Sequence, residues 1–295
     1  MWSRFSSVLL LLLVGVLWGL NWPVVKILMS ELPTYTIRAI AFPVAAVILA
    51  TQALVKKETI IPSVRQLVAL CITGTFLVFG FNMLTSLGQS LTEASKAAIV
   101  AYTMPAMTAA LSVVFLKESM QPKTVIALCA GMLGIVVLIF EELGVMLAYP
   151  AGVFAMLCAA FSWAVGNILL KAQTWTLGTT ARAAWFFAIS TLLTWPVVWM
   201  LGELAELQTP SITTIALMIF HILGPMVLCY QLWALLLTRL SVSVAAISVL
   251  TAPVVGVLSS VFLVGDKLTL HKVIALLLIV TSIGITQIRL NKSDS

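Results

Sequence analysis

Ten long apolar runs dominate this 295-residue chain and limit what it can fold into. Each is roughly 18 to 23 residues long, the length with which an α-helix crosses about 30 Å of hydrocarbon. The runs cover residues 8–28, 34–54, 66–87, 95–116, 123–141, 149–170, 183–201, 212–235, 243–264 and 270–288. Membrane-spanning β-strands are shorter and alternate in polarity, so the pattern excludes a barrel. With 62% hydrophobic residues, no soluble domain of this length could bury its apolar surface.

The first run is expected to remain as a spanning helix. Arg4 precedes a leucine-rich stretch as in a signal peptide, but no small-residue cleavage site follows. The connections between runs are too short to hold a soluble domain. We therefore expect the function to lie within the membrane or at its surfaces, with the lipid bilayer as the surrounding partner.

The basic residues fall mainly on one side of the predicted membrane. If the N-terminus is cytoplasmic, most of the sixteen Lys and Arg residues are cytoplasmic, namely Arg4, Lys56, Lys57, Arg65, Lys117, Lys123, Lys171, Arg182, Arg239, Arg289 and Lys292. The opposite side holds Lys26, Lys96, Lys267 and Lys272. The positive-inside rule then predicts that both termini are cytoplasmic. The net charge of +6 is attributed to this topology and not to binding of nucleic acid.

An internal repeat divides the chain. "SKAAIVAYTMP" at 95–105 resembles "SVAAISVLTAP" at 243–253, and the same offset of 148 residues places Glu118 on Asp266. A second pair, "WGLNWPVVK" at 18–26 and "WAVGNILLK" at 163–171, joins the first and sixth runs.

These matches predict two five-helix units, residues 1–146 and 147–295. Because five is odd, successive units must enter the membrane from opposite sides. The predicted fold is therefore an all-α integral membrane protein of ten transmembrane helices arranged as two inverted repeats. Inverted repeats are how many secondary transporters build two interconvertible states around a site at the bilayer midplane.

The chain resembles the EamA-type transporters of the drug/metabolite transporter superfamily. The resemblance rests on the Trp-containing first helix of each half, on Arg38 in the second helix, and on the Ala-Ala…Pro helix followed by an acid. Within that family it is similar to bacterial exporters of amino acids, including aromatic ones, and of related metabolites. The resemblance implies ten helices around a central cavity, an inner-membrane location, and export by alternating access.

Trp18, Asn21 and Trp22 are the first candidate substrate-binding residues. Their spacing of i, i+3 and i+4 places them on one helix face, and Pro23 frees a backbone carbonyl nearby. An amide is costly in hydrocarbon unless it is hydrogen-bonded or wet, so this face is expected to line a cavity. The alternative is that Asn21 joins two helices by a hydrogen bond.

The other candidates share helical spacing or aromatic character at similar depth. They are Phe79, Asn82, Ser86, Tyr102, Trp163, Asn167, Tyr230 and Trp233. His221 is the only deep group that titrates near neutral pH, and it is either a proton carrier or a hydrogen-bonded structural residue.

No Asp or Glu falls deep within a run, which disfavours a proton-coupled exporter of drugs, although that alternative is kept. Basic residues at depth are too few for a sugar-phosphate site. A small neutral or zwitterionic solute remains the expected substrate.

The chain has no motif for catalysis, for a metal or for a cofactor, and its four cysteines have no metal-binding spacing. An intramembrane enzyme and a non-transporting scaffold are the weaker alternatives. The sequence does not require an oligomer, so a monomer is allowed.

Overall fold

The computed structural model describes residues 4–92, 99–264 and 268–292, and over these residues it consists of helices and connections without a strand. The helices up to residue 148 are α1 (Arg4–Leu28), α2 (Thr36–Val55), α3 (Val64–Gly74), η1 (Thr75–Gly80), α4 (Phe81–Leu91), α6 (Met104–Phe115) and α7 (Pro122–Ala148). Those that follow are α8 (Pro150–Ala172), α9 (Thr179–Met200), η2 (Glu203–Glu206), α10 (Ile212–His221), η3 (Ile222–Cys229), α11 (Tyr230–Arg239), α12 (Val242–Ser248), α13 (Thr251–Val264) and α14 (Leu270–Lys292).

Eight helical stretches among the described residues are long and apolar enough to cross a membrane. Two of them are composite, because α3, η1 and α4 continue one another, as do α10, η3 and α11. The two remaining predicted runs, 95–116 and 270–288, coincide with shorter apolar helices at Ile99–Phe115 and Leu270–Ile285.

The outer surface of the bundle is apolar. Val47, Phe140 and Leu192 are 66, 69 and 74% exposed although each lies within a helix long enough to span a bilayer. A soluble protein rarely leaves so many large apolar side chains uncovered. Lipid is the environment in which these exposed side chains are stable.

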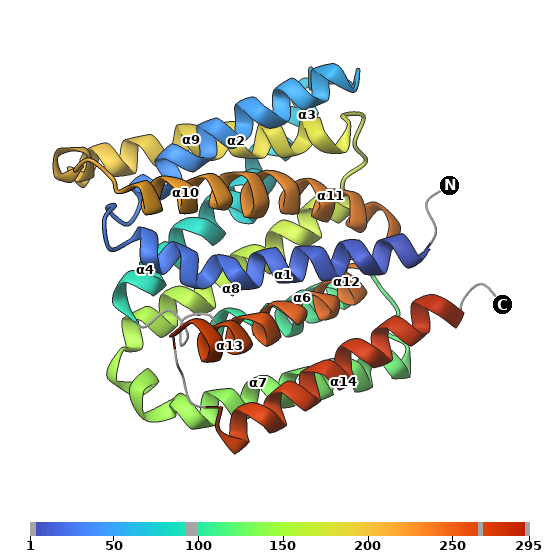
Figure 1. Cartoon of the computed structure of the whole chain (residues 1–295). Coiled ribbons are helices and arrows are strands. Elements are labelled where there is room, and N and C mark those ends of the chain that lie inside the picture. The colour runs from blue at the N-terminus through green and yellow to red at the C-terminus, as the bar shows by residue number, and fades with distance from the viewer. Residues whose placement is uncertain (1–3, 93–98, 265–267, 293–295) are drawn as a thin grey trace.

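The helices pack largely against helices from the other half of the chain (Figure 1). Helices α2 and α9 pack together along one side of the bundle, and α7 and α14 pack together along the opposite side. Between these pairs, α1 packs against α13, and α8 packs against α4 and α6. Helices α1 and α8 therefore lie near the centre of the bundle.

Two π-helical segments, η1 and η3, interrupt the composite spans at matching places. A π-helical turn leaves backbone groups without their usual helical partner. The Ser162 hydroxyl of α8 donates to the Phe76 carbonyl of η1 at 2.7 Å, and the Trp18 indole of α1 donates to the Pro225 carbonyl of η3 at 3.2 Å. Each segment is thus stabilised by the central helix of the other half.

Two lysine side chains donate hydrogen bonds to carbonyls at helix C-termini in the same reciprocal way. Lys26, at the end of α1, donates to the Gln89 and Thr92 carbonyls at the end of α4, at 2.9 and 3.2 Å. Lys171, at the end of α8, donates to the Leu237 and Leu240 carbonyls at the end of α11, at 2.6 and 3.0 Å. We refer to the two ends of the bundle as the Lys26 end and the Lys171 end, which lie left and right in Figure 1.

Helices α2 and α9 are tied to each other by two carboxylates. Glu203, after α9, accepts a hydrogen bond from the Thr36 N–H at the start of α2 at 2.7 Å. Glu58, after α2, accepts from the Ala181 N–H at the start of α9 at 2.9 Å. Carboxylates stabilise helix N-termini because the first N–H groups have no partner within the helix. The pair α2 and α9 is therefore held at both ends.

Candidate substrate cavity

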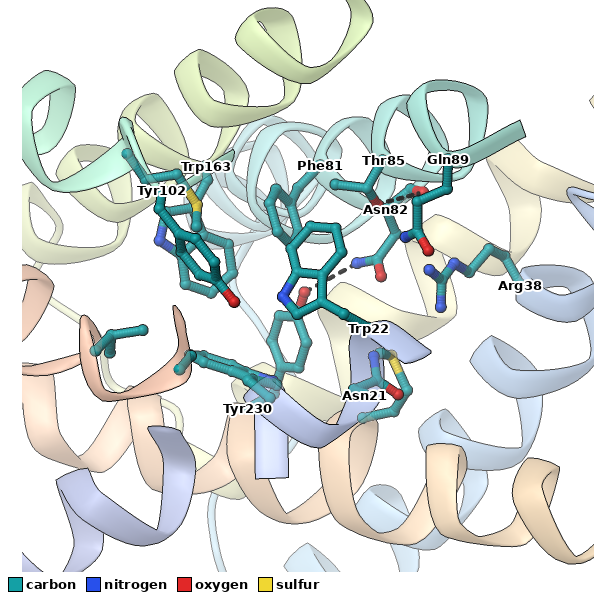
Figure 2. A pocket seen from close by; sticks show the side chains of 15 residues that line it. Asn21, Trp22, Arg38, Phe81, Asn82, Thr85, Gln89, Tyr102, Trp163 and Tyr230 are labelled. Carbon is teal, nitrogen blue, oxygen red and sulfur yellow. Dashed lines mark hydrogen bonds between the residues drawn. The ribbon is translucent and has the colours of Figure 1, made fainter. Parts of the chain in front are cut away.

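A cavity lies between the central helices, toward the Lys26 end (Figure 2). Its walls come from α1, α2, α4, α8, η3, α11, α13, the start of α6, the turn before α6 and the turn before α13. The lining residues are Trp18, Asn21, Trp22, Arg38, Phe81, Asn82, Thr85, Gln89, Tyr102, Met104, Trp163, Met226, Tyr230, Val249 and Ala252. The centre of a water molecule can move in about 60 Å³ of it, which at roughly 10–15 Å³ per molecule is room for several waters.

Aromatic rings form much of the wall. Trp18 of α1 stands edge-on to Trp163 of α8, with ring centroids 5.2 Å apart, and contacts Tyr230 at 5.8 Å. Trp163 also packs against Phe81 at 4.9 Å. These separations are those of favourable aromatic pairs. Because α1 and α8 each contribute a tryptophan, the two halves of the chain meet at this wall.

The same aromatic group is sealed toward the Lys171 end. Trp233 lies 5.6 Å from Trp18 and 5.7 Å from Trp163 and is only 1% exposed. Its indole N–H donates to the Asn167 side-chain oxygen at 2.6 Å, and the Asn167 amide donates to the Trp163 carbonyl at 2.8 Å. Trp233 and Asn167 therefore close the cavity on this side and do not line it.

A chain of polar side chains crosses from α1 to α4. The Arg38 guanidinium donates to Ser86 Oγ at 3.2 Å through Nε and to His221 Nε2 at 2.7 Å through Nη1. Because arginine only donates, His221 accepts at Nε2, and its ring proton lies on Nδ1. That N–H then donates to Asn21 Oδ1, 2.7 Å away. A second proton on the ring would require Arg38 to move.

One polar contact joins corresponding positions of the two halves. The Asn82 amide donates to the Tyr230 hydroxyl at 2.9 Å, and the two residues are 148 apart, which is the offset of the sequence repeat. The contact therefore joins equivalent positions of the sequence repeat at the cavity wall.

The predicted site residues fall into two groups. Seven line the cavity: Trp18, Asn21, Trp22, Asn82, Tyr102, Trp163 and Tyr230. Five lie outside the lining: Phe79, which is half-buried in η1, Ser86 and His221, which hold Arg38, and Asn167 and Trp233.

Sequence reasoning left out several lining residues. Thr85 follows Asn82 at i+3, so the helical spacing could have identified it. Gln89, at i+7, shares the helical spacing of Phe79, Asn82 and Ser86 and is recognisable from the sequence. From the sequence, Arg38 could be recognised only as a basic residue deep within a predicted membrane span. Nothing in the local pattern indicates Met226, Val249 or Ala252.

The lining presents aromatic and polar neutral groups and few charges. It contains a single charged side chain, that of Arg38. Within the described ranges, no group of three or more His, Cys, Asp or Glu residues is arranged to hold a metal ion. The cavity therefore offers aromatic faces, amides, hydroxyls and one cation to a ligand.

Comparison with known proteins identifies relatives over nearly the whole chain. The sequence profile of the EamA-like transporter family matches twice, at residues 5–140 and 150–287. A "Probable amino-acid metabolite efflux pump" of Salmonella typhimurium is 28% identical over 276 residues, covering 88% of this chain and 87% of the relative. Its Escherichia coli namesake is 26% identical, covering 96% of this chain and 95% of the relative.

Other relatives have no assigned substrate. The "Uncharacterized transporter YoaV" of Bacillus subtilis is 20% identical and covers 90% of this chain and 91% of the relative. One crystal structure matches with a TM-score of 0.79 at 20% identity, covering 99% of this chain and all of that chain. At this identity the structure supports the fold alone.

Proposed function

Because the chain belongs to the EamA-like transporter family, we propose that it exports small neutral or zwitterionic metabolites through the central cavity. Amino acids, including aromatic ones, are the foremost candidates. Two relatives carry the name of amino-acid metabolite efflux pumps, which supports both the solute class and the direction.

The amphipathic cavity is the observation that carries this proposal. Figure 2 shows the polar groups of Arg38, Asn82 and Gln89 on one side and the rings of Tyr102 and Trp163 on the other. Small-molecule sites combine apolar walls with a few placed polar groups in this way. A solute with a polar head and an apolar side chain fits such a site.

The proposed mechanism is alternating access by ten helices in two inverted repeats, residues 1–146 and 147–295. The reciprocal contacts of Lys26 and Lys171, and of Glu58 and Glu203, support it, because each member of a pair acts at the opposite end of the bundle. Such symmetry allows the two halves to exchange conformations about a fixed site.

The proposed location is the bacterial inner membrane with both termini in the cytoplasm, which makes the Lys171 end cytoplasmic. The cavity then lies in the external half of the membrane, and Trp233 with Asn167 closes the cytoplasmic path. This arrangement corresponds to a state from which the solute leaves outward.

Flux of radiolabelled amino acids from sealed proteoliposomes tests the proposal. Replacing Trp18 by Ala removes a stacking surface worth about 1–1.5 kcal/mol, so we expect roughly a five- to tenfold lower affinity. The variant Trp22→Ala tests the same wall if the first variant does not fold. The matched control is Trp199→Ala, since Trp199 is 75% exposed on the outside of α9.

Equal flux in all three variants and the unaltered protein, at substrate concentrations below saturation, would contradict the cavity assignment. Absence of flux for every amino acid in the unaltered protein would contradict the function itself. Flux should proceed down a substrate gradient without a proton gradient, because His221 is engaged by Arg38 and Asn21. Flux that depends on an imposed proton gradient would restore His221 as a proton carrier.

A further inference from the structure

Arg38 is a buried cation whose protein partners are all neutral. Its side chain is 2% exposed and is held by the hydroxyl of Ser86 and the ring of His221. None of its hydrogen-bond partners among the described residues is a carboxylate. A buried charge is stable only when it is paired or well hydrogen-bonded. Arg38 is therefore suited to accept an anion from outside the protein.

Two hydrogen bonds position the guanidinium and leave its other N–H groups available to a ligand. Nε–H is directed at Ser86 and one Nη1–H at His221, which Asn21 orients from its other ring nitrogen. Guanidinium has five N–H groups in a planar fork, so donors remain. Arg38 lines the cavity, and Figure 2 shows its guanidinium directed toward the cavity interior. A planar fork matches the two oxygens of a carboxylate.

A second residue of the same lining has a buried hydrogen-bond acceptor that lacks a donor. Gln89 is 2% exposed, and its side-chain oxygen is buried without a hydrogen-bond donor among the described residues. Figure 2 shows the Gln89 amide on the same side of the cavity as Arg38. An unpaired buried acceptor is costly. The charge-assisted N–H of a ligand ammonium would satisfy it more strongly than a neutral N–H would.

We propose that Arg38 and Gln89 form a receptor for a zwitterion, in which Arg38 binds the α-carboxylate and Gln89 accepts a hydrogen bond from the α-ammonium of an amino acid. The inference rests on the proposed function and narrows it to one substrate class. The amino-acid side chain then points toward Trp163 and Tyr102. Tyr102 also presents a buried hydroxyl at the far side of the cavity, which can accept a hydrogen bond from a phenolic O–H or an indole N–H group of the ligand.

Binding to the purified protein in detergent tests the receptor with three matched ligands. Phenylalanine carries both charges, phenylalaninamide lacks the anion, and N-acetylphenylalanine lacks the cation. For the unaltered protein we expect phenylalanine to bind roughly ten- to hundredfold more tightly than either derivative, as charge-assisted hydrogen bonds imply.

The variants separate the two contacts. Arg38→Gln should remove the preference for phenylalanine over the amide, and Gln89→Leu should remove only the preference over the N-acetyl derivative. If Arg38→Gln does not fold, Arg38→Lys keeps the charge without the fork and should give an intermediate preference. The matched control is Arg182→Gln, a buried arginine that stacks on Trp175 outside the lining, which should keep both preferences.

The outcomes distinguish this receptor from the function on which it rests. If phenylalanine and its amide bind equally, or if Arg38→Gln and Arg38→Lys both keep the full preference, the receptor is wrong while amino-acid transport stands. If the unaltered protein neither binds nor transports any α-amino acid, the proposed function fails and the receptor fails with it.

Discussion

At the scale of single residues, the exposed connections carry carboxylates that bind helix N-termini across the halves. Glu31, in the connection after α1, accepts hydrogen bonds from the Ser211 backbone N–H and hydroxyl, both at 2.8 Å. Ser211 is itself the N-cap of α10. These bonds, the backbone one first, lower the pKa of Glu31 below its ordinary value of 4.5.

The lowered pKa of Glu31 predicts a pH dependence. A depressed folded-state pKa stabilises the protein above the unfolded value of 4.5, and this contribution is lost as the pH falls through the folded value. We therefore expect the Tm difference between the unaltered protein and Glu31→Gln to be constant between about pH 8 and pH 6. The Tm difference should shrink as the pH falls below 4.5, the ordinary pKa of the Glu31 carboxyl group.

A series of melting curves over that pH range checks the expectation. Glu206→Gln is the control, because Glu206 lies at the same end and its side chain has no hydrogen bond to another described residue. A Tm difference for Glu31→Gln that grows as the pH is lowered would contradict the assigned direction. The effect is small, because Glu31 is exposed and solvent screens it.

The site residues show what sequence can and cannot predict at this scale. Trp18, Asn21 and Trp22 could be placed on one cavity-facing side because helical spacing is a local property. The partners of Asn21 and Arg38 could not be predicted, since His221 lies 200 and 183 residues away from them. Only the tertiary fold brings these three side chains together.

At the scale of helices, the composition of each run predicts spans but not their internal geometry. The run at 183–201 was expected to begin after Arg182, yet α9 begins at Thr179. Arg182 is buried against Trp175, and Glu58 accepts a hydrogen bond from the Ala181 N–H. These contacts stabilise a first helical turn that lies outside the apolar run. Of the two π-helical segments, η3 contains Pro225, which removes a helix hydrogen bond, whereas η1 contains no proline to indicate it.

The contact of η1 with α8 predicts the effect of a glycine replacement. A Cβ at Gly166 would lie 2.6 Å from Leu77 Cα in η1, closer than any real contact. The other two nearest atoms are the Leu77 Cβ and backbone N, both at 2.7 Å, so turning a side chain away cannot relieve the clash. Gly166→Ala should therefore destabilise the protein by about 1–3 kcal/mol, measured as a lower Tm in detergent.

The matched control for Gly166 is Gly284 in α14, where no heavy atom lies within 4 Å of the added Cβ. Gly284→Ala should be neutral or stabilising by up to about 1 kcal/mol, because alanine loses less backbone entropy in a helix. An unchanged Tm for Gly166→Ala would mean that η1 and α8 do not pack as closely as described.

At the scale of the whole molecule, the sequence repeat and the distribution of charge predict different properties: which helices correspond, and how the protein is oriented in the membrane. The repeat predicts which helices correspond, and the packing of α2 with α9 and of α7 with α14 is consistent with that correspondence. The repeat does not indicate which face of the membrane each end meets, because the proposed inverted pair is symmetric in that respect. Only the uneven distribution of Lys and Arg breaks the symmetry.

Labelling of single cysteines tests the orientation. The four native cysteines are first replaced, because Cys71 and Cys129 are exposed. Thr59, after α2, and Gln173, after α8, are exposed at the Lys171 end, and Ala205 is exposed near η2 at the Lys26 end. None of the three side chains belongs to the cavity lining, so each replacement should leave transport intact.

A membrane-impermeant thiol reagent should label Thr59→Cys and Gln173→Cys only after the inner face is exposed, and Ala205→Cys from outside intact cells. This expectation rests on the positive-inside rule, applied to the basic residues near Thr59 and Gln173, among them Lys56, Lys57 and Lys171. If all three positions are labelled from the opposite side, the inferred orientation of the protein in the membrane is reversed, and so is the side of the membrane nearest to the cavity. Labelling of Thr59→Cys and Ala205→Cys from one side would instead contradict the odd number of crossings between them, and therefore the fold.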